Sequence, residues 1–286
     1  MTKSGIKLIE CPRDAMQGWK HFIPTDKKIA YIKQLLQVGF DTIDAGSFVS
    51  AKAIPQMADT AQVMTALDMS HTSSKLLVIV ANERGAEEAV KQAPVTYLGF
   101  PFSVSETFQQ RNTNSSIAES LKRVEAIQAL CRASGKQLVI YISMGFGNPY
   151  GDPWSAEIVF DWVREIAARG INIISLADTV GLATPEQVFD ITQHVIQQLP
   201  GQEIGVHLHS TPVNWKAKTE AALRAGCRRF DGALKGIGGC PMANDELVGN
   251  MDTERMIPFF KEQGLLEHLD EAALAESSRM AANIFI

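Results

Sequence analysis

QLVIYIS, residues 137–143, is a nearly unbroken apolar run of strand length. Such a run suits a parallel strand that is buried on both faces of a sheet. A longer amphipathic segment, residues 155–169, follows it. The same alternation of a short apolar run and a helical segment recurs along the whole chain, so this pair is the repeating unit of the predicted fold.

Eight such pairs are present. The strand candidates are 6–10, 41–44, 75–81, 95–100, 137–143, 172–177, 203–208 and 228–232, and the helix candidates lie near 25–38, 56–67, 83–92, 116–133, 155–169, 185–199, 213–225 and 252–263. Eight strand–helix units in about 250 residues indicate an α/β fold of the TIM (β/α)₈ barrel type. An open, doubly wound sheet is the alternative, and it is disfavoured because no G-x-G-x-x-G follows the first strand. We predict a single catalytic domain over residues 1–286, with one or two extra C-terminal helices after about residue 264.

The composition narrows the classes of function. The chain has 286 residues and a net charge of −5. Its hydrophobic fraction of 45% is typical of soluble proteins. It has no basic stripe, no apolar stretch of membrane-spanning length and no secretory or transit segment. Its four cysteines have no framework spacing, which suggests reduced thiols. We therefore expect a cytoplasmic protein without nucleic-acid or membrane partners.

Histidines stand at the end of the seventh strand candidate. His207 and His209 flank Leu208, and residues i and i+2 of a strand point to the same face, with Cα atoms roughly 6.5 Å apart. Two imidazoles so placed could hold one metal ion, to which Asp14 could add a carboxylate and Asn250 a carbonyl oxygen. This donor set suits Mg²⁺, Mn²⁺, Zn²⁺ or Fe²⁺. Taken singly, each residue could instead be a polar strand end or a turn residue.

Other polar residues follow strand ends, where barrel active sites lie. Arg13 could hold a carboxylate or a developing oxyanion, and Asp44 and Asp178 could orient Arg13 or a histidine. Alternatively, Arg13 forms an ion pair that closes the barrel mouth. Cys240 lies in a glycine-rich loop, where a thiol could exchange a proton or act as a nucleophile.

These residues belong to motifs that cover most of the chain. The motifs are Pro12-Arg13-Asp14 with Gln17, Gly46-Ser47-Phe48-Val49-Ser50 through Pro55-Gln56-Met57, Asn112-x-Asn114-x-Ser116, Asp178-Thr179-x-Gly181, Val206-His207-x-His209 and Gly238-Gly239-Cys240-Pro241. With them, residues 6–280 resemble the 3-hydroxy-3-methylglutaryl-CoA (HMG-CoA) lyase family, within the wider HMGL-like family of metal-dependent (β/α)₈ lyases and synthases. Ser-Phe-Val-Ser and Gly-Gly-Cys-Pro are the most specific pieces.

The resemblance implies an oxo-acid lyase that cleaves HMG-CoA to acetoacetate and acetyl-CoA by a retro-Claisen reaction, as in leucine degradation and ketone-body metabolism. It implies a divalent metal, Mg²⁺ or Mn²⁺ with Zn²⁺ as an alternative, an acyl-CoA thioester as substrate and a homodimer as assembly. The implied roles are metal ligation by Asp14, His207, His209 and Asn250, catalysis by Cys240, Arg13 and His207, and substrate binding by Arg13, Asp44, Asp178 and Gln17.

The chain also departs from the family pattern. Ser210 stands where an aspartate usually follows the second metal histidine, and Ala15 stands where a glycine usually follows Arg-Asp. Two alternatives therefore remain open. One is a related aldolase or acyl-CoA condensing enzyme on the same barrel, with a pyruvate or oxo-acid substrate. The other is a metal-binding homologue with altered catalysis.

Overall fold

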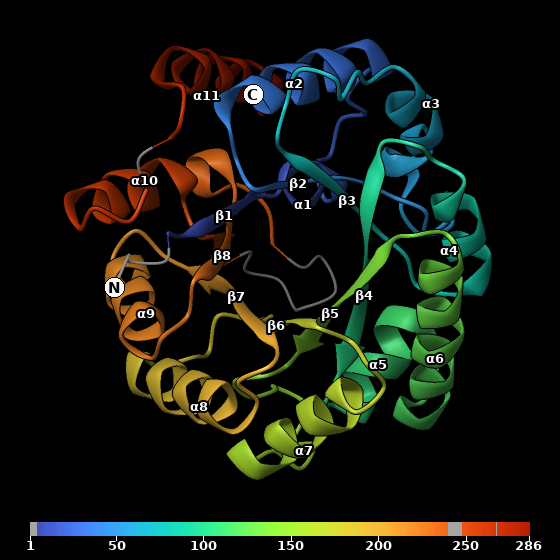
Figure 1. The fold of residues 1–286 in the computed structure, drawn as a ribbon, viewed down its shortest axis with the longest axis vertical. Coiled ribbons are helices and arrows are strands. Elements are labelled where there is room, and N and C mark those ends of the chain that lie inside the picture. Colours follow the sequence, from blue (N-terminus) through green and yellow to red (C-terminus); the bar gives the residue numbers. More distant parts are fainter. Residues whose placement is uncertain (1–4, 240–247, 267) are drawn as a thin grey trace.

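The computed structural model describes residues 5–239, 248–266 and 268–286. Its centre is a closed ring of parallel strands surrounded by helices, seen end-on in Figure 1. The strands of the ring are β1 (Lys7–Glu10), β2 (Thr42–Ser47), β3 (Lys75–Ile79), β4 (Val95–Ser103), β5 (Gln137–Ser143), β6 (Ile173–Asp178), β7 (Glu203–Ser210) and β8 (Arg229–Gly232). Each pairs in parallel with the next, and β8 pairs with β1. The predicted (β/α)₈ barrel is confirmed, and the open sheet is excluded.

Helices cover the outside of this ring. They are α2 (Thr25–Val38), α3 (Thr60–Thr65), α4 (Glu83–Val90), α6 (Ile117–Ala133), α7 (Ala156–Ala167), α8 (Pro185–Gln198), α9 (Trp215–Arg224) and α10 (Thr253–Glu262). Local sequence fixes several of their ends. Ser116 and Thr184 each begin a helix with a capping box, and Gly39 ends α2 with a φ of 92°, a left-handed conformation that a side chain would strain.

The inner and outer faces of the strands carry different residues. A large apolar cluster fills the layer between strands and helices, whereas Leu77, Tyr97, Val139, Tyr141 and Ile173 form a smaller cluster on the barrel's inner face. Because alternate residues of a strand face opposite sides, the inner face of β5 continues from Tyr141 to the polar end of the strand. The barrel interior is therefore filled by side chains up to its carboxyl end.

Several short elements were not predicted. They are α1 (Pro12–Gln17), α5 (Glu106–Thr113), η2 (Leu234–Gly236) and β9 (Gly249–Asn250), whereas η1 (Pro55–Met57) falls within the helix predicted near 56–67. Strand β9 pairs antiparallel with the end of β7, which places Asn250 opposite His209. These additions lie at the carboxyl ends of the strands, so they shape the mouth of the barrel.

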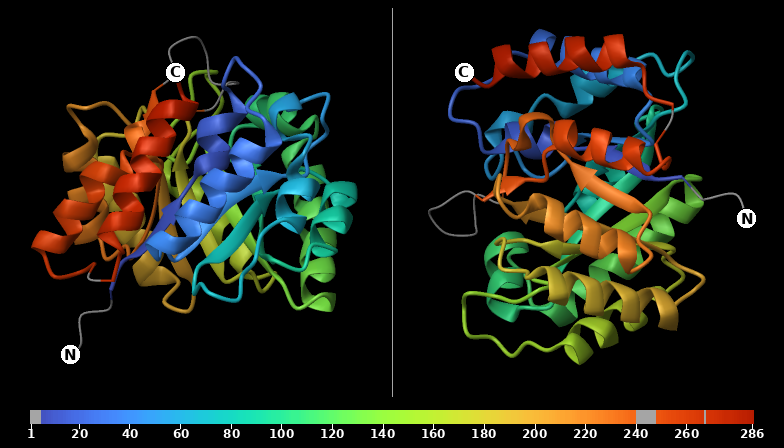
Figure 2. Two further views of the ribbon diagram at one scale, coloured as in Figure 1. Left: turned by 90° about the horizontal axis from the view of Figure 1, so that it is seen from above. Right: turned by 90° about the vertical axis from the view of Figure 1, so that its left-hand side faces the viewer.

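The C-terminal segment forms α11 (Glu271–Ile284), which packs on α2 outside the ring, as Figures 1 and 2 show. The Asp270 amide donates to the carbonyl of Val38, and Gln34 donates through Nε2 to the carbonyl of Ala273. The prediction of an extra C-terminal helix is confirmed. Within the described part of the chain, no helix is long and apolar enough to cross a membrane.

Candidate metal centre and active site

Arg13 lies directly after β1, on the first turns of α1, and its guanidinium is buried. Its Nε atom donates to both carboxylate oxygens of Asp44 (3.2 and 3.0 Å), and Nη2 donates to Asp44 Oδ2 (2.5 Å). Its Nη1 atom donates to Asp14 Oδ1 (2.9 Å) and to Gln17 Oε1 (2.8 Å). A two-pronged ion pair of this kind fixes the plane of the guanidinium as well as its charge. The cation is therefore held rigidly at the barrel mouth.

Asp14, His207 and His209 converge beside Arg13. Their candidate ligand atoms lie within 4.8 Å of one another, and the Nε2 atoms of the two imidazoles are 3.4 Å apart. Asn250 approaches from β9 and donates through Nδ2 to Asp14 Oδ2 (2.7 Å). The four residues come from α1, β7 and β9, which are far apart in sequence. The structure thus brings together all four residues that the sequence suggested as ligands.

The protonation states of this cluster suit a cation. Burial raises the pKa of Asp14, but the charges of Arg13 and the histidines outweigh burial and lower that pKa to about 2. Burial lowers the pKa of His209 to about 4, with a further lowering by His207. At neutral pH Asp14 is therefore ionised and His209 is uncharged, which are the forms that bind metals.

Two observations test whether a divalent metal fits here. Asn250 Oδ1 is buried and has no hydrogen-bond partner among the described residues, although Nδ2 is fully engaged with Asp14 and the Ile237 carbonyl. Beside it, Gly238 has a φ of 108°, and a Cβ atom there would come within 2.5 Å of Asn250 Nδ2 and 3.0 Å of the Asp14 carbonyl oxygen. An unsatisfied oxygen, a carboxylate and two imidazoles in a space kept open by a glycine are a donor set that fits Mg²⁺, Mn²⁺ or Zn²⁺.

The cluster forms part of the wall of a cavity of about 220 Å³. The polar part of its wall consists of Arg13, Asp14, Gln17, Asn112, Thr113, Ser143, Thr179, His207 and His209, and the remaining wall consists of Val49, Ala53, Ile54, Ile79, Ala81, Pro101, Phe108, Tyr141 and Ala177. A ligand with a polar head and an apolar body is the kind that such a wall accommodates.

Asp44 and Asp178 were predicted to bind substrate, and this stays a prediction; neither of them is among the described residues that line the cavity. Asp44 lies behind the Arg13 guanidinium, in the orienting role that the sequence left open for it. Asp178 faces the outer layer, where Oδ2 accepts from Lys218 Nζ (2.7 Å) and Oδ1 accepts from the Ala183 amide (3.1 Å). Strand alternation explains this, since Ala177 and Thr179 on either side of Asp178 face the cavity.

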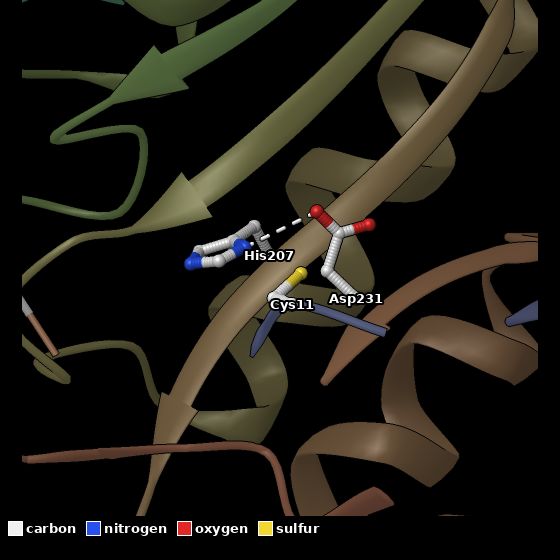
Figure 3. Close-up of side chains that lie close together, drawn as sticks. All are labelled: Cys11, His207 and Asp231. Carbon is white, nitrogen blue, oxygen red and sulfur yellow. Dashed lines mark hydrogen bonds and ion pairs between the residues drawn. The ribbon is translucent and has the colours of Figure 1, made fainter. Parts of the chain in front are cut away.

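Two residues that the sequence analysis did not single out support the site. Lys218, on α9, is completely buried and donates to Asp178, to the Gly181 carbonyl (3.2 Å) and to the His209 carbonyl (2.9 Å). Asp231, on β8, lies with Oδ2 3.1 Å from His207 Nδ1, on the far side of the ring from the ligand cluster (Figure 3). Each is a charged residue in the middle of a buried strand or helix face, and this pattern could have indicated a functional role for Lys218 and Asp231.

Cys240, the predicted loop cysteine, lies outside the described residues, so its placement relative to the cavity stays a prediction. The other three cysteines, Cys11, Cys131 and Cys227, are buried and unpaired. This agrees with the expectation of reduced thiols.

The fold is an eight-stranded α/β barrel, and an Asp–His–His cluster lies at the carboxyl ends of its strands. These two features define this chain as a (β/α)₈ protein with the donor set of a divalent-metal enzyme. The particular family follows from comparison with known proteins. The chain belongs to the HMGL-like family, whose profile matches residues 6–281.

Curated relatives and solved structures agree with this membership. The chain is 35% identical over 266 residues to the rat cytoplasmic HMG-CoA lyase, covering 93% of this chain and 77% of that protein. It is 35% identical over 253 residues to the bovine mitochondrial hydroxymethylglutaryl-CoA lyase, covering 88% and 77%. Among solved structures, the HMG-CoA lyase of Acinetobacter baumannii in complex with coenzyme A and 3-methylmalate superimposes with a TM-score of 0.92, at 34% identity and with 100% and 92% of the two chains covered.

Proposed function

We propose that this protein is a divalent-metal-dependent HMG-CoA lyase, which cleaves 3-hydroxy-3-methylglutaryl-CoA to acetoacetate and acetyl-CoA. One observation carries the proposal: the Asp14–His207–His209 cluster lines a cavity in a chain that is 35% identical to HMG-CoA lyases over most of its length. The polar residues of the cavity wall suit the hydroxyl and carboxylate of the acyl group. The rest of the wall suits its methyl-bearing carbon chain.

The residues of the site have separable roles in this reaction. A metal held by Asp14, His207, His209 and Asn250 would supply Lewis-acid polarisation of the substrate's oxygens. Arg13 borders the cavity and is locked by Asp44, so its charge is in place before the enolate oxyanion of acetyl-CoA develops. Gln17, which also lines the cavity, accepts from Arg13 and donates to Asp14 Oδ1 (3.0 Å). It can therefore align both groups against a substrate.

The cleavage itself needs a base and an acid. A base removes the proton of the tertiary hydroxyl, and the bond from that carbon to the methylene next to the thioester breaks. Its electron pair becomes the enolate, which an acid protonates to give acetyl-CoA. The sequence suggested His207 for proton transfer, but its Nδ1 faces Asp231 and its Nε2 faces the ligand cluster. With both ring nitrogens committed, we assign His207 to ligation, and Cys240 remains the proposed proton donor.

The test is a spectrophotometric assay for acetoacetate and acetyl-CoA release from HMG-CoA, with Mg²⁺ or Mn²⁺ and after removal of metal by EDTA. We expect turnover with metal and almost none without it. The absence of turnover while one equivalent of Mn²⁺ is bound would refute the proposal. It would leave the two rivals, which a parallel assay with pyruvate and other oxo-acids separates, since only an aldolase or condensing enzyme would turn these over.

Further expectations accompany this proposal. The metal is expected to be Mg²⁺ or Mn²⁺ rather than Zn²⁺, which competition binding would decide. We also propose a homodimer, a cytoplasmic location and a single catalytic domain. The named relatives include both cytoplasmic and mitochondrial enzymes. Location is therefore best tested directly by fractionation, and assembly by sedimentation.

A further inference from the structure

The face of His207 that points away from the cavity is also occupied. Its Nδ1 atom lies 3.1 Å from Oδ2 of Asp231, whose side chain is completely buried in the barrel interior (Figure 3). An ionised carboxylate only accepts hydrogen bonds, so Nδ1 must carry the proton of the neutral imidazole. The lone pair is then on Nε2, the nitrogen 3.4 Å from His209 Nε2. This contact therefore selects the tautomer that can ligate a metal.

A buried arginine lies on the same strand face as Asp231, toward the amino end of β8. Arg229 precedes Asp231 by two residues on the same face of β8 and is 1% exposed. Burial lowers the pKa of Arg229, but the charges of Asp231 and Glu203 outweigh burial and raise that pKa overall, so the guanidinium is a cation whose charge acts on Asp231. Asp231 thus has a positive charge two residues away on its own strand and the His207 ring on the neighbouring strand β7.

Several buried polar atoms have no hydrogen-bond partner in the described part of the chain. They include Asp231 Oδ1 and atoms of two residues that interact electrostatically with Asp231, namely Arg229 Nε and Nη2 and Tyr141 Oη. Donors and an acceptor that are jointly unsatisfied inside a protein are usually bridged by ordered water. The Asp231 oxygen that does not contact His207 is therefore free to accept from such a water.

We propose that Asp231 is the positioning residue of the metal centre. It accepts the Nδ1–H of His207, fixes the ring plane and tautomer, and leaves the Nε2 lone pair directed at the ligand cluster, while the charge of Arg229 favours the carboxylate. This inference rests on the proposed metal site. It adds a residue of β8 to the metal centre, although β8 supplies none of the four proposed ligands.

The same region offers a competing interpretation. Cys11, His207 and Asp231 have candidate ligand atoms within 4.8 Å of one another and could form a second metal site. Burial, and then the charge of Asp231, raise the pKa of the Cys11 thiol well above its ordinary value, which disfavours the thiolate that a metal needs. His207 Nδ1 is moreover already paired with Asp231. Cys11 is therefore a neighbour of the ring and a suitable control position.

The decisive variant is Asp231→Asn, which keeps the shape of the side chain. The positive charge of Arg229 attracts the amide oxygen rather than the NH₂, so we expect the NH₂ to face His207 Nδ1. The proton of His207 then moves to Nε2, which can no longer ligate. We expect the Kd for Mn²⁺, measured from the electron paramagnetic resonance of free Mn²⁺, to rise about 10- to 100-fold. Cys11→Ala should bind Mn²⁺ as the unmodified protein does.

A second measurement reports the tautomer directly. Long-range ¹H–¹⁵N spectra of the metal-free protein at alkaline pH, with the His207 signals assigned by their loss in His207→Gln, should show Nδ1–H in the unmodified protein and Nε2–H in Asp231→Asn. An Nε2–H tautomer in the unmodified protein would overturn the proposal, even if Asp231→Asn did not fold. Unchanged Mn²⁺ affinity in a folded Asp231→Asn would also overturn it.

The controls separate this inference from its alternatives. A loss of Mn²⁺ or Zn²⁺ binding in Cys11→Ala as large as that in Asp231→Asn would overturn it in favour of a shared Cys–His–Asp site. None of these readouts involves HMG-CoA. A protein that shows the expected metal affinities and tautomers but cleaves no thioester would refute the proposed function and support the role of Asp231.

Discussion

The two ends of the barrel carry buried charges in opposite arrangements. At the amino ends of the strands, the cation of Arg229 pairs with Glu203 (3.2 Å), which also pairs with the partly exposed Lys7. At the carboxyl ends, the carboxylates of Asp14, Asp44 and Asp231 share the interior with one arginine and two imidazoles. The amino end is balanced by its own residues, whereas the carboxyl end has acceptors that a divalent cation would satisfy.

The crowding at the carboxyl end is visible in Asp44. Burial raises its pKa to about 6, even though Arg13 pairs with it and opposes the shift, and the charges of Asp14 and Asp231 add to the increase. Carboxylates held this close together repel one another and reduce stability, which is a common cost of a functional site. We infer that the amino end mainly stabilises the barrel and the carboxyl end mainly serves chemistry. The following changes test this division.

The largest effect is expected for Asp14→Asn, which removes a ligand charge and keeps the shape of the side chain. Loss of the metal would remove several kcal/mol of transition-state stabilisation, so turnover of HMG-CoA should fall at least ~1000-fold. Removal of metal from the unmodified protein by EDTA should reduce turnover to the same floor. Turnover within tenfold of the unmodified protein would contradict a metal role for Asp14.

A large effect on stability is expected for Lys218→Met, in the supporting layer of the carboxyl end. The substitution leaves Asp178 buried without its partner and frees the carbonyl of His209. Breaking a buried pair in this way typically costs about 3–5 kcal/mol, which urea unfolding would measure. Adding Asp178→Asn removes the unpaired charge and keeps an acceptor for Ala183, so the double variant should recover much of the loss. A loss below ~1 kcal/mol in the single variant would contradict this role.

The fold was largely predictable from the sequence because each strand is a compact apolar run and each major helix has an amphipathic pattern. The missed helices α1 and α5 are short and polar, and they owe their positions to contacts at the barrel mouth rather than to periodicity. Strand β9 has two residues and exists only because β7 is available to pair with it. Such elements depend on tertiary contacts that no local pattern encodes.

The proposed metal ligands could be predicted from the sequence, but the residues that orient these ligands could not. The spacing of His207 and His209 gave their common face directly, whereas the direction of Asp178 could not be determined. A strand that is apolar on both faces, such as β6, contains no alternation that fixes which residues point inward. Asp231 and Lys218 act through partners on other elements, so their roles appear only when β7, β8 and α9 are assembled.

A moderate, pH-dependent effect is expected at Glu10, the last residue of β1. It is completely buried, with Oε1 accepting from the Leu234 amide (2.8 Å) and Oε2 accepting from Thr253 Oγ1 (2.6 Å). Burial raises its pKa from 4.5 to about 8, despite these hydrogen bonds. Between these two values the folded protein binds the extra proton, so the contribution of Glu10 to stability is present at low pH and is lost as pH rises toward 8.

Glu10→Gln should remove this dependence, because the amide stays neutral in both states. Urea unfolding of the unmodified protein should lose up to ~1.4 kcal/mol per pH unit in that window from Glu10 alone. The variant should show a flatter profile and a higher stability near pH 8. Parallel profiles for the two proteins would contradict a buried, neutral Glu10.

The smallest effect is expected for Lys7→Met at the amino end. The Lys7 and Glu203 side chains are 42% and 30% exposed, so water and salt screen their attraction. Such a pair contributes ~1 kcal/mol or less, and the difference between variant and unmodified protein in urea unfolding should shrink further at high salt. HMG-CoA turnover should stay within about twofold, in contrast to Asp14→Asn. A tenfold loss of turnover would show that charge at the amino end reaches His207 through Glu203, Arg229 and Asp231, and the two ends of the barrel would then have to be treated as one electrostatic unit.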